Sequence, residues 1–310
     1  MIMCLAGRNR VDLPYRDLDD LRARYAFEDL PAFLELYYAN MAVLQTADDF
    51  AAMTRAYLQR AAAGGVRHVE LFVDPQAHLA RGVALEAVVD GVAGALADVG
   101  PGLDLSTGLI ACFLRDRPAD EAVDVLRSLL ALDAPLLGVG LDSAEAGHPP
   151  GVFAEVFELA AEAGLHRVAH AGEEGPAAYV REALDALGVE RIDHGIRSLD
   201  DPALVERLVA DAVPLTVCPL SNVRLRCVPD LRAHPLAEML RKGLRVSVHS
   251  DDPAYFGGYV DDNYRAVTEA LGLSRDEVAR LAHHAVDAAF VPAARAAQLH
   301  AEVDAWHRPR

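Results

Sequence analysis

The sequence is poor in positive charge and in cysteine, and both shortages exclude classes of protein. Its 310 residues carry 29 Lys and Arg against 47 Asp and Glu, which gives a net charge of −18. Such a surface would repel nucleic acid and anionic membranes, so we expect neither as a partner. The cysteines have no paired spacing, which predicts reduced thiols in a cytoplasmic protein; they are Cys4, Cys112, Cys218 and Cys227.

Long apolar runs and linkers are also missing. No apolar run is long enough to cross a bilayer. Met1–Ala6 is too short for a signal peptide, and basic residues follow it rather than precede it. No stretch rich in Pro, Gly or Ser divides the chain, and 52% of its residues are hydrophobic. We therefore expect a single domain over residues 1–310 with a sizeable core.

Short apolar runs alternate with stretches of helical spacing. The runs that resemble strands are residues 66–73, 105–112, 136–141, 167–170, 191–194, 214–218 and 245–250. The helical stretches between them are rich in Ala and Leu and include residues 119–132, 153–163, 177–187 and 201–210. This alternation predicts parallel βαβ units and an α/β fold, a TIM-type (β/α)8 barrel.

Only seven strands can be counted, because the residues before Val66 have the pattern of helices and loops. Asp29-Leu30-Pro31 is a typical helix start, and a further helix is expected over Asp48–Ala63. We expect N-terminal helices over 1–65, barrel strands two to eight over 66–251, and a C-terminal loop and helices over 252–310. A seven-stranded barrel has unpaired edges, so the first strand is expected to lie outside this sequence. An uncovered edge would also favour a homo-oligomer.

Residues suited to a metal site stand where three of the strands end. They occur in His170-Ala171-Gly172-Glu173, Asp193-His194-Gly195 and Ser250-Asp251-Asp252-Pro253. Histidines and paired aspartates at the carboxyl ends of parallel strands indicate a metal site with its own acid and base. The sequence contains no His-x-His pair, although a site of this kind normally has two more nitrogen ligands.

With these motifs the chain resembles the adenosine/adenine deaminase family of zinc-dependent barrel enzymes, from about Leu5 to Leu299. The matching motifs are residues 170–176, 191–195, 218–222 and 250–253, in the family's order. Residues 74–78, 140–145 and 253–259 are more similar to the adenine deaminase branch. Members of the family usually open with a strand that ends in His-Leu-His, and this chain begins just beyond that point.

The resemblance implies a role for each residue of the motifs. His170 and Asp251 would bind one Zn²⁺, which makes water a competent nucleophile near neutral pH. Glu173 would protonate a ring nitrogen and pass a proton to the departing ammonia, while His194 orients the attacking water. Asp252 would contact the purine on its imidazole side.

Other residues have weaker or simpler interpretations. By the same resemblance, Ser143 and Glu145 are further contacts to the base. Cys218 is typical of a small buried residue rather than a ligand. His283-His284 lies in a helical stretch and is typical of a solvated or capping pair. His194 or His249 could supply a replacement metal ligand.

The implied reaction is hydrolysis of a small-molecule aminopurine, with adenine converted to hypoxanthine and ammonia. Adenosine or a modified adenine nucleoside is the alternative substrate. Because the His-x-His pair is absent, the activity of this chain is in doubt and a second class stays open. In that class the chain is a non-catalytic purine-binding or interaction homologue that has lost the first ligand strand, and its zinc affinity would be low.

Overall fold

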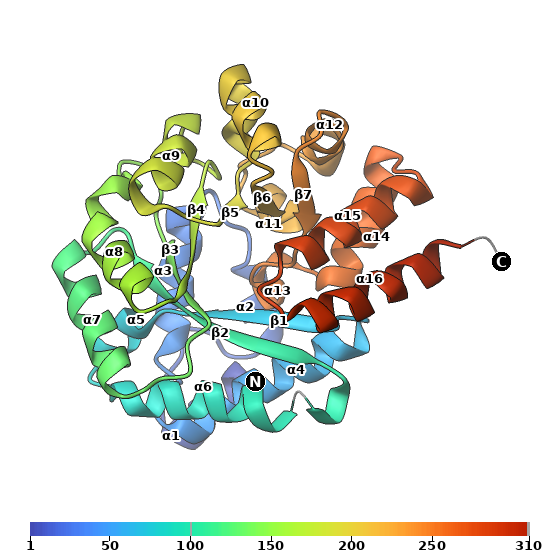
Figure 1. Cartoon of the computed structure of the whole chain (residues 1–310). Helices are drawn as coiled ribbons and strands as arrows, with labels where there is room; N and C mark the ends of the chain where they lie inside the picture. Colours follow the sequence, from blue (N-terminus) through green and yellow to red (C-terminus); the bar gives the residue numbers. More distant parts are fainter. Residues whose placement is uncertain (100, 309–310) are drawn as a thin grey trace. The chain divides into compact units, whose positions relative to one another are not determined.

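The computed structural model describes residues 1–99 and 101–308 and divides the chain into two compact units, Met1–Ala144 and Glu145–Arg310. Each unit combines parallel strands with helices (Figure 1). The described residues contain seven strands, three in the first unit and four in the second, as the sequence predicts. None of the described helices is long and apolar enough to span a membrane.

The first unit is built on a parallel three-stranded sheet. Strand β2 (Ser106–Leu114) pairs with β1 (His68–Val73) on one side and with β3 (Gly138–Asp142) on the other. The three strands end near one another at their carboxyl ends, because Val73 pairs with Ala111 and Asp142 with Leu114. The helices of this unit are α1 (Ile2–Asn9), α2 (Leu18–Ala23), α3 (Leu30–Met41), α4 (Ala47–Ala63), α5 (Pro75–Leu79), α6 (Leu85–Val99), η1 (Pro101–Leu103) and α7 (Ala119–Ala131).

Helices α4 and α6 pack closely against each other and form much of the core of the first unit. Phe50, Leu58 and Val88 are fully buried there. The approach is close because Gly91 has no side chain: a Cβ on it would lie 2.7 Å from Cβ of Phe50. The position therefore requires glycine.

Local capping explains where these helices begin. The side chain of Asp29 accepts a hydrogen bond from the backbone N–H of Ala32 at 2.9 Å, which confirms the predicted start of α3. Thr46 and Asp49 form a capping box at the start of α4, one residue before the predicted position.

The second unit contains a parallel four-stranded sheet in sequence order. Its strands are β4 (His166–Ala171), β5 (Arg191–His194), β6 (Pro214–Val217) and β7 (Arg245–Val248). Its helices are η2 (Pro150–Phe153), α8 (Ala154–Glu162), α9 (Ala177–Glu182), the π-helical η3 (Ala183–Leu187), η4 (Ile196–Asp200), α10 (Pro202–Ala210), α11 (Pro219–Arg224), η5 (Leu231–Ala233), α12 (Leu236–Arg241), α13 (Pro253–Phe256), α14 (Val260–Leu271), α15 (Arg275–Ala288) and α16 (Ala293–His307).

The register of this sheet places chemically active residues next to one another. His170 pairs with Asp193, and Ala171 pairs with His194. The two histidines therefore stand at adjacent strand ends, as the motif positions predict. Helix α15 packs against β6 and β7, and α16 packs against α15 (Figure 1).

Candidate metal and catalytic site

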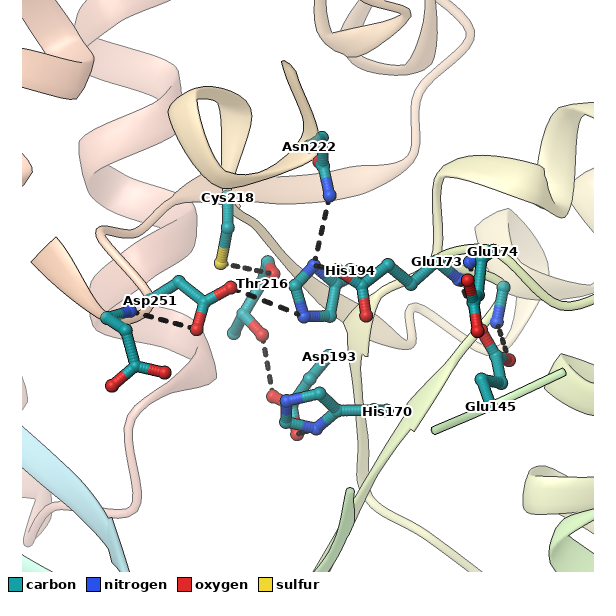
Figure 2. A network of polar contacts seen from close by, with 12 residues as sticks. Glu145, His170, Glu173, Glu174, Asp193, His194, Thr216, Cys218, Asn222 and Asp251 are labelled. Atoms are coloured by element: carbon teal, nitrogen blue, oxygen red, sulfur yellow. Dashed lines mark hydrogen bonds and ion pairs between the residues drawn. The ribbon is translucent and has the colours of Figure 1, made fainter. Parts of the chain in front are cut away.

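Donor atoms from three strand ends converge in the second unit. One ligand atom each of His194, Cys218 and Asp251 lies within 4.8 Å of the others (Figure 2). His194 Nε2 is 3.9 Å from Asp251 Oδ2. His194 and Asp251 both have left-handed backbone conformations, with φ of 64° and 56°. Such strain in residues other than glycine is typical of functional sites, where it directs a side chain.

His170 joins this group from the end of β4. Its ring lies edge-on to that of His194, with centroids 4.8 Å apart, and its Nδ1 is 3.4 Å from Asp193 Oδ2. Burial alone would raise the pKa of Asp193, but its contact with His170 and the charge of Arg191 hold that pKa well below its ordinary value. An ionised carboxylate only accepts hydrogen bonds, so His170 Nδ1 carries the ring proton. The lone pair of the ring is therefore on Nε2. In metal sites, the second ring nitrogen of a ligating histidine commonly donates to a carboxylate in this way, which fixes the orientation of the ring.

His194 has the opposite tautomer, because a chain of hydrogen bonds reaches it from the backbone. The N–H of Leu236 donates to His234 Nδ1 at 3.1 Å, so His234 Nε2 carries the proton and donates to Asn222 Oδ1 at 3.2 Å. The Asn222 amide then donates to His194 Nδ1 at 3.2 Å. The lone pair of His194 is therefore on Nδ1, and in the neutral ring its Nε2 is a hydrogen-bond donor that lies near Asp251.

Glu173 lies on the loop that follows β4, and only 3% of it is exposed. Its Oε1 is 3.6 Å from His194 Nδ1 and makes no hydrogen bond to any residue that the structure describes. Burial raises the pKa of Glu173 well above its ordinary value, and the charge of Asp251 raises it further. A carboxyl group in this environment is held protonated and can act as a general acid.

Glu145 holds this loop in place. Its carboxylate accepts hydrogen bonds from four successive backbone N–H groups, those of residues 172–175, at 2.6–3.0 Å (Figure 2). Only 1% of Glu145 is exposed. Successive N–H groups form a concave anion site, and here a side chain occupies it. The sequence predicts a contact of Glu145 with the base, whereas the geometry supports a role in positioning Glu173.

The remaining predicted residues are divided between the units. Asp252 follows Asp251 in the second unit, and its N–H donates to Asp251 Oδ1 at 2.9 Å. Ser143 belongs to the first unit, where its Oγ is 3.0 Å from the hydroxyl of Tyr38. His249 contacts Ser247 Oγ at 2.8 Å. Motif reasoning missed Asn222 and His234 as partners of His194, although Asn222 stands in a matching motif; His234 had no sequence signal.

The first unit contains a second cluster of three donors. Ligand atoms of Asp74, Cys112 and Asp142 lie within 4.8 Å of one another near the ends of β1, β2 and β3. Burial raises the pKa of the nearby Tyr38, and the charges of Asp74 and Asp142 raise it further. These three donors include no imidazole. In the second unit, by contrast, His170 is oriented by its contact with the Asp193 carboxylate. The donor types of the second unit fit zinc better, since zinc prefers nitrogen and sulfur ligands.

Comparison with known proteins agrees with these features. The model of the adenosine deaminase family matches residues 1–306. The chain belongs to the adenosine deaminase family. Members of this family are metal-dependent.

Individual relatives are close to the whole chain. The adenine deaminase of Streptomyces coelicolor is 57% identical over 312 residues, with 100% of this chain and 92% of that protein covered. The crystal structure of the adenine deaminase from Arthrobacter aurescens matches with a TM-score of 0.97 and 60% identity, covering 98% of this chain and 93% of that chain. These matches assign the chain to the α/β class with a TIM-type barrel fold, as the sequence predicts.

A more distant solved structure contains the expected metal. It is an amidohydrolase from Burkholderia ambifaria with bound Zn, which matches with a TM-score of 0.88 and 26% identity. The match covers 99% of this chain and 85% of that chain.

Proposed function

We propose that this chain is an adenine deaminase that converts adenine and water to hypoxanthine and ammonia. The observation that carries the proposal is the position of Glu173, a buried carboxyl group whose Oε1 lies 3.6 Å from His194 Nδ1, while His194 Nε2 lies 3.9 Å from Asp251 Oδ2. The relatives that are 54–57% identical over the full chain and are named adenine deaminases support the same reaction. Their identity also means that the doubt about activity, raised by the absent His-x-His pair, is not borne out.

We assign His170 and Asp251 as protein ligands of the metal, with Zn²⁺ as the metal. His170 fits because Asp193 braces its Nδ1 and leaves the ring lone pair on Nε2. His194 is less suited, because the hydrogen bond from Asn222 makes its Nε2 a donor. Cys218 is left out of the assignment, because its buried thiol donates to the backbone carbonyl of Thr216 at 3.6 Å. A bound Zn²⁺ supplies the Lewis acidity that makes water a competent nucleophile near neutral pH.

The chain's own residues then carry out the proton transfers. Glu173 gives its proton to a purine ring nitrogen, which makes the neighbouring amino-bearing carbon electrophilic. His194 donates a hydrogen bond from Nε2 to the attacking oxygen and orients it. The new C–O bond forms, and Glu173 takes one proton from the oxygen and passes it to the amino group. The C–N bond then breaks to release ammonia, and the second proton of the oxygen returns to Glu173 as the C=O bond forms. We assign Asp252 to the imidazole side of the purine.

Ammonia release from adenine and from adenosine tests this function directly. The zinc-supplemented protein should deaminate adenine faster than adenosine. Glu173→Gln should lower kcat by about 10²–10⁴-fold, the usual contribution of general acid–base catalysis. Glu162→Gln, the same change at an exposed residue of α8, is the matched control and should keep full activity.

Two outcomes would overturn the proposal. Faster turnover of adenosine would make the chain a nucleoside deaminase. Absence of ammonia release from either substrate, in a folded protein that has bound zinc, would favour the non-catalytic homologue.

A further inference from the structure

Two histidines outside the candidate site face each other between the last two helices of the chain. His283 on α15 and His300 on α16 have their Nδ1 atoms 2.8 Å apart, and their rings meet edge to edge, with an angle of 24° between their planes and centroids 5.1 Å apart. The two helices pack side by side (Figure 1). Of the His283 and His300 side chains, 29% and 32% are exposed, so an ion from solvent can reach them.

Each histidine also contacts a carboxylate of the opposite helix. His283 Nε2 is 3.2 Å from Asp304 Oδ1, and His300 Nε2 is 3.1 Å from Asp287 Oδ1. The arrangement is reciprocal, because each helix contributes one histidine and an aspartate four residues later. Residues at this spacing lie on the same face of a helix.

The carboxylates determine the tautomer of both rings. An ionised carboxylate only accepts hydrogen bonds, so Nε2 of His283 and Nε2 of His300 each carry a proton. In two neutral rings both Nδ1 atoms then hold a lone pair, and these point at each other across 2.8 Å. Two lone pairs this close repel, so a proton or a metal ion must lie between them.

We propose that this pair is a second metal site, for a divalent ion that favours imidazole, such as Zn²⁺ or Ni²⁺. His283 Nδ1 and His300 Nδ1 are the ligands, and water completes the coordination. Zn–N bonds of about 2.0–2.1 Å in tetrahedral geometry place two nitrogens roughly 3.4 Å apart. The rings therefore need to separate by about half an ångström and to tilt, so that both lone pairs point at one ion. Asp304 and Asp287 serve as the outer carboxylates that orient ligating histidines.

This site is independent of the proposed deaminase reaction, since it shares no residue with the strand-end cluster. Nickel titration of the tag-free protein, followed by calorimetry and by the unfolding temperature Tm, tests it. His283→Gln and His300→Gln should each abolish one equivalent of bound Ni²⁺ and the accompanying rise in Tm. Asp287→Asn should weaken that binding by about 10–100-fold.

His307→Gln is the matched control. His307 also lies on α16 and contacts an aspartate of α15, with its Nε2 2.8 Å from Asp276 Oδ1, but no second imidazole contacts it among residues 1–99 and 101–308. This variant should keep the full nickel stoichiometry. Chemical modification of the unmutated protein with diethyl pyrocarbonate gives a second readout, in which Ni²⁺ should protect His283 and His300.

The proposal fails if the unmutated protein takes up no nickel at these histidines, which would mean that only a proton lies between them. It also fails if nickel binding is the same in the His283 and His300 variants as in the His307 variant. A variant that does not fold leaves the protection experiment to decide, because that experiment needs no substitution.

Discussion

The two units of the chain use the same construction and gather different chemistry at the ends of their strands. In the first unit, Asp74, Cys112 and Asp142 bring two carboxylates and a thiol together. In the second unit, the strand ends bring His170, His194 and Asp251 beside a buried acid. The fold of parallel strands and covering helices therefore places side chains together at the strand ends. The types of these residues determine which metal or reaction the site can support.

The surroundings of the donors differ as well. In the second unit each histidine of the site has a partner that fixes its proton: Asp193 for His170 and Asn222 for His194. The buried histidine of the first unit, His78, has its proton placed by a single charged neighbour, because its Nδ1 accepts a hydrogen bond from Arg81 at 2.7 Å. A catalytic group needs a defined protonation state, and in the second unit a chain of hydrogen bonds through Asn222 and His234 supplies one for His194.

The largest expected difference between the units is in metal content. His170→Asn should reduce bound zinc from about one per chain to nearly none and lower deaminase activity by at least about 10³-fold, because a ligand is lost. Asp74→Asn should leave the zinc content unchanged. Elemental analysis of both purified variants measures this, and loss of zinc in Asp74→Asn would erase the distinction between the two clusters.

Acid should weaken both units through one buried histidine in each. Burial lowers the pKa of His78 to about 4, with a smaller effect of Arg81, and burial lowers the pKa of His234 to about 4. Both pKa values are below the unfolded value of 6.5, so the unfolded chain binds protons first and stability falls as pH drops from about 6.5 to 4. Each histidine should account for up to about 3 kcal/mol of this loss.

Urea unfolding at pH 7 and pH 4.5 measures that loss. His78→Gln and His234→Gln should each reduce the difference between the two pH values. An unchanged difference in both variants would show that other groups cause the acid sensitivity. A reduction in only one variant would show that a buried histidine causes acid sensitivity in one unit and not in the other.

A close helix contact should make the first unit sensitive to one added methyl group. Gly91→Ala places a Cβ against the backbone of Ala47 and the side chain of Phe50, and it should lower the free energy of unfolding by about 1–3 kcal/mol. Gly94→Ala on the same helix meets no atom within 4 Å and should be neutral or stabilise by up to about 1 kcal/mol. Equal effects of the two substitutions in urea unfolding would contradict the packing argument.

The smallest expected effect tests the hydrogen-bond network around His194 in the second unit. Asn222→Ala removes the donor to His194 Nδ1 and should lower kcat by about 10-fold, with zinc content unchanged. The pH profile of kcat should shift as well, because His194 can then adopt either tautomer. His234→Gln should produce a weaker shift in the same direction. An unchanged pH profile in Asn222→Ala would mean that Asn222 has only a structural role.

Much of the local structure could be predicted from the sequence, because periodicity and capping are local properties. All seven strands occur where apolar runs predict them, and Asp29 caps α3 as expected. The stretch 177–187 was predicted as one helix, and it divides into α9 and the π-helical η3 before Gly188, whose φ is 59°. The single domain over 1–310 stays a prediction.

The sequence by itself determined which residues could perform the chemistry: His170, Glu173, His194 and Asp251 stand at strand ends in recognisable motifs. Only the tertiary structure decided how these residues are supported. It placed Glu145 under the Glu173 loop, connected His234 to His194, and brought His283 against His300. The reason is physical: strand and helix periodicity is encoded over a few neighbouring residues, whereas these contacts depend on sheet register and helix packing between distant segments.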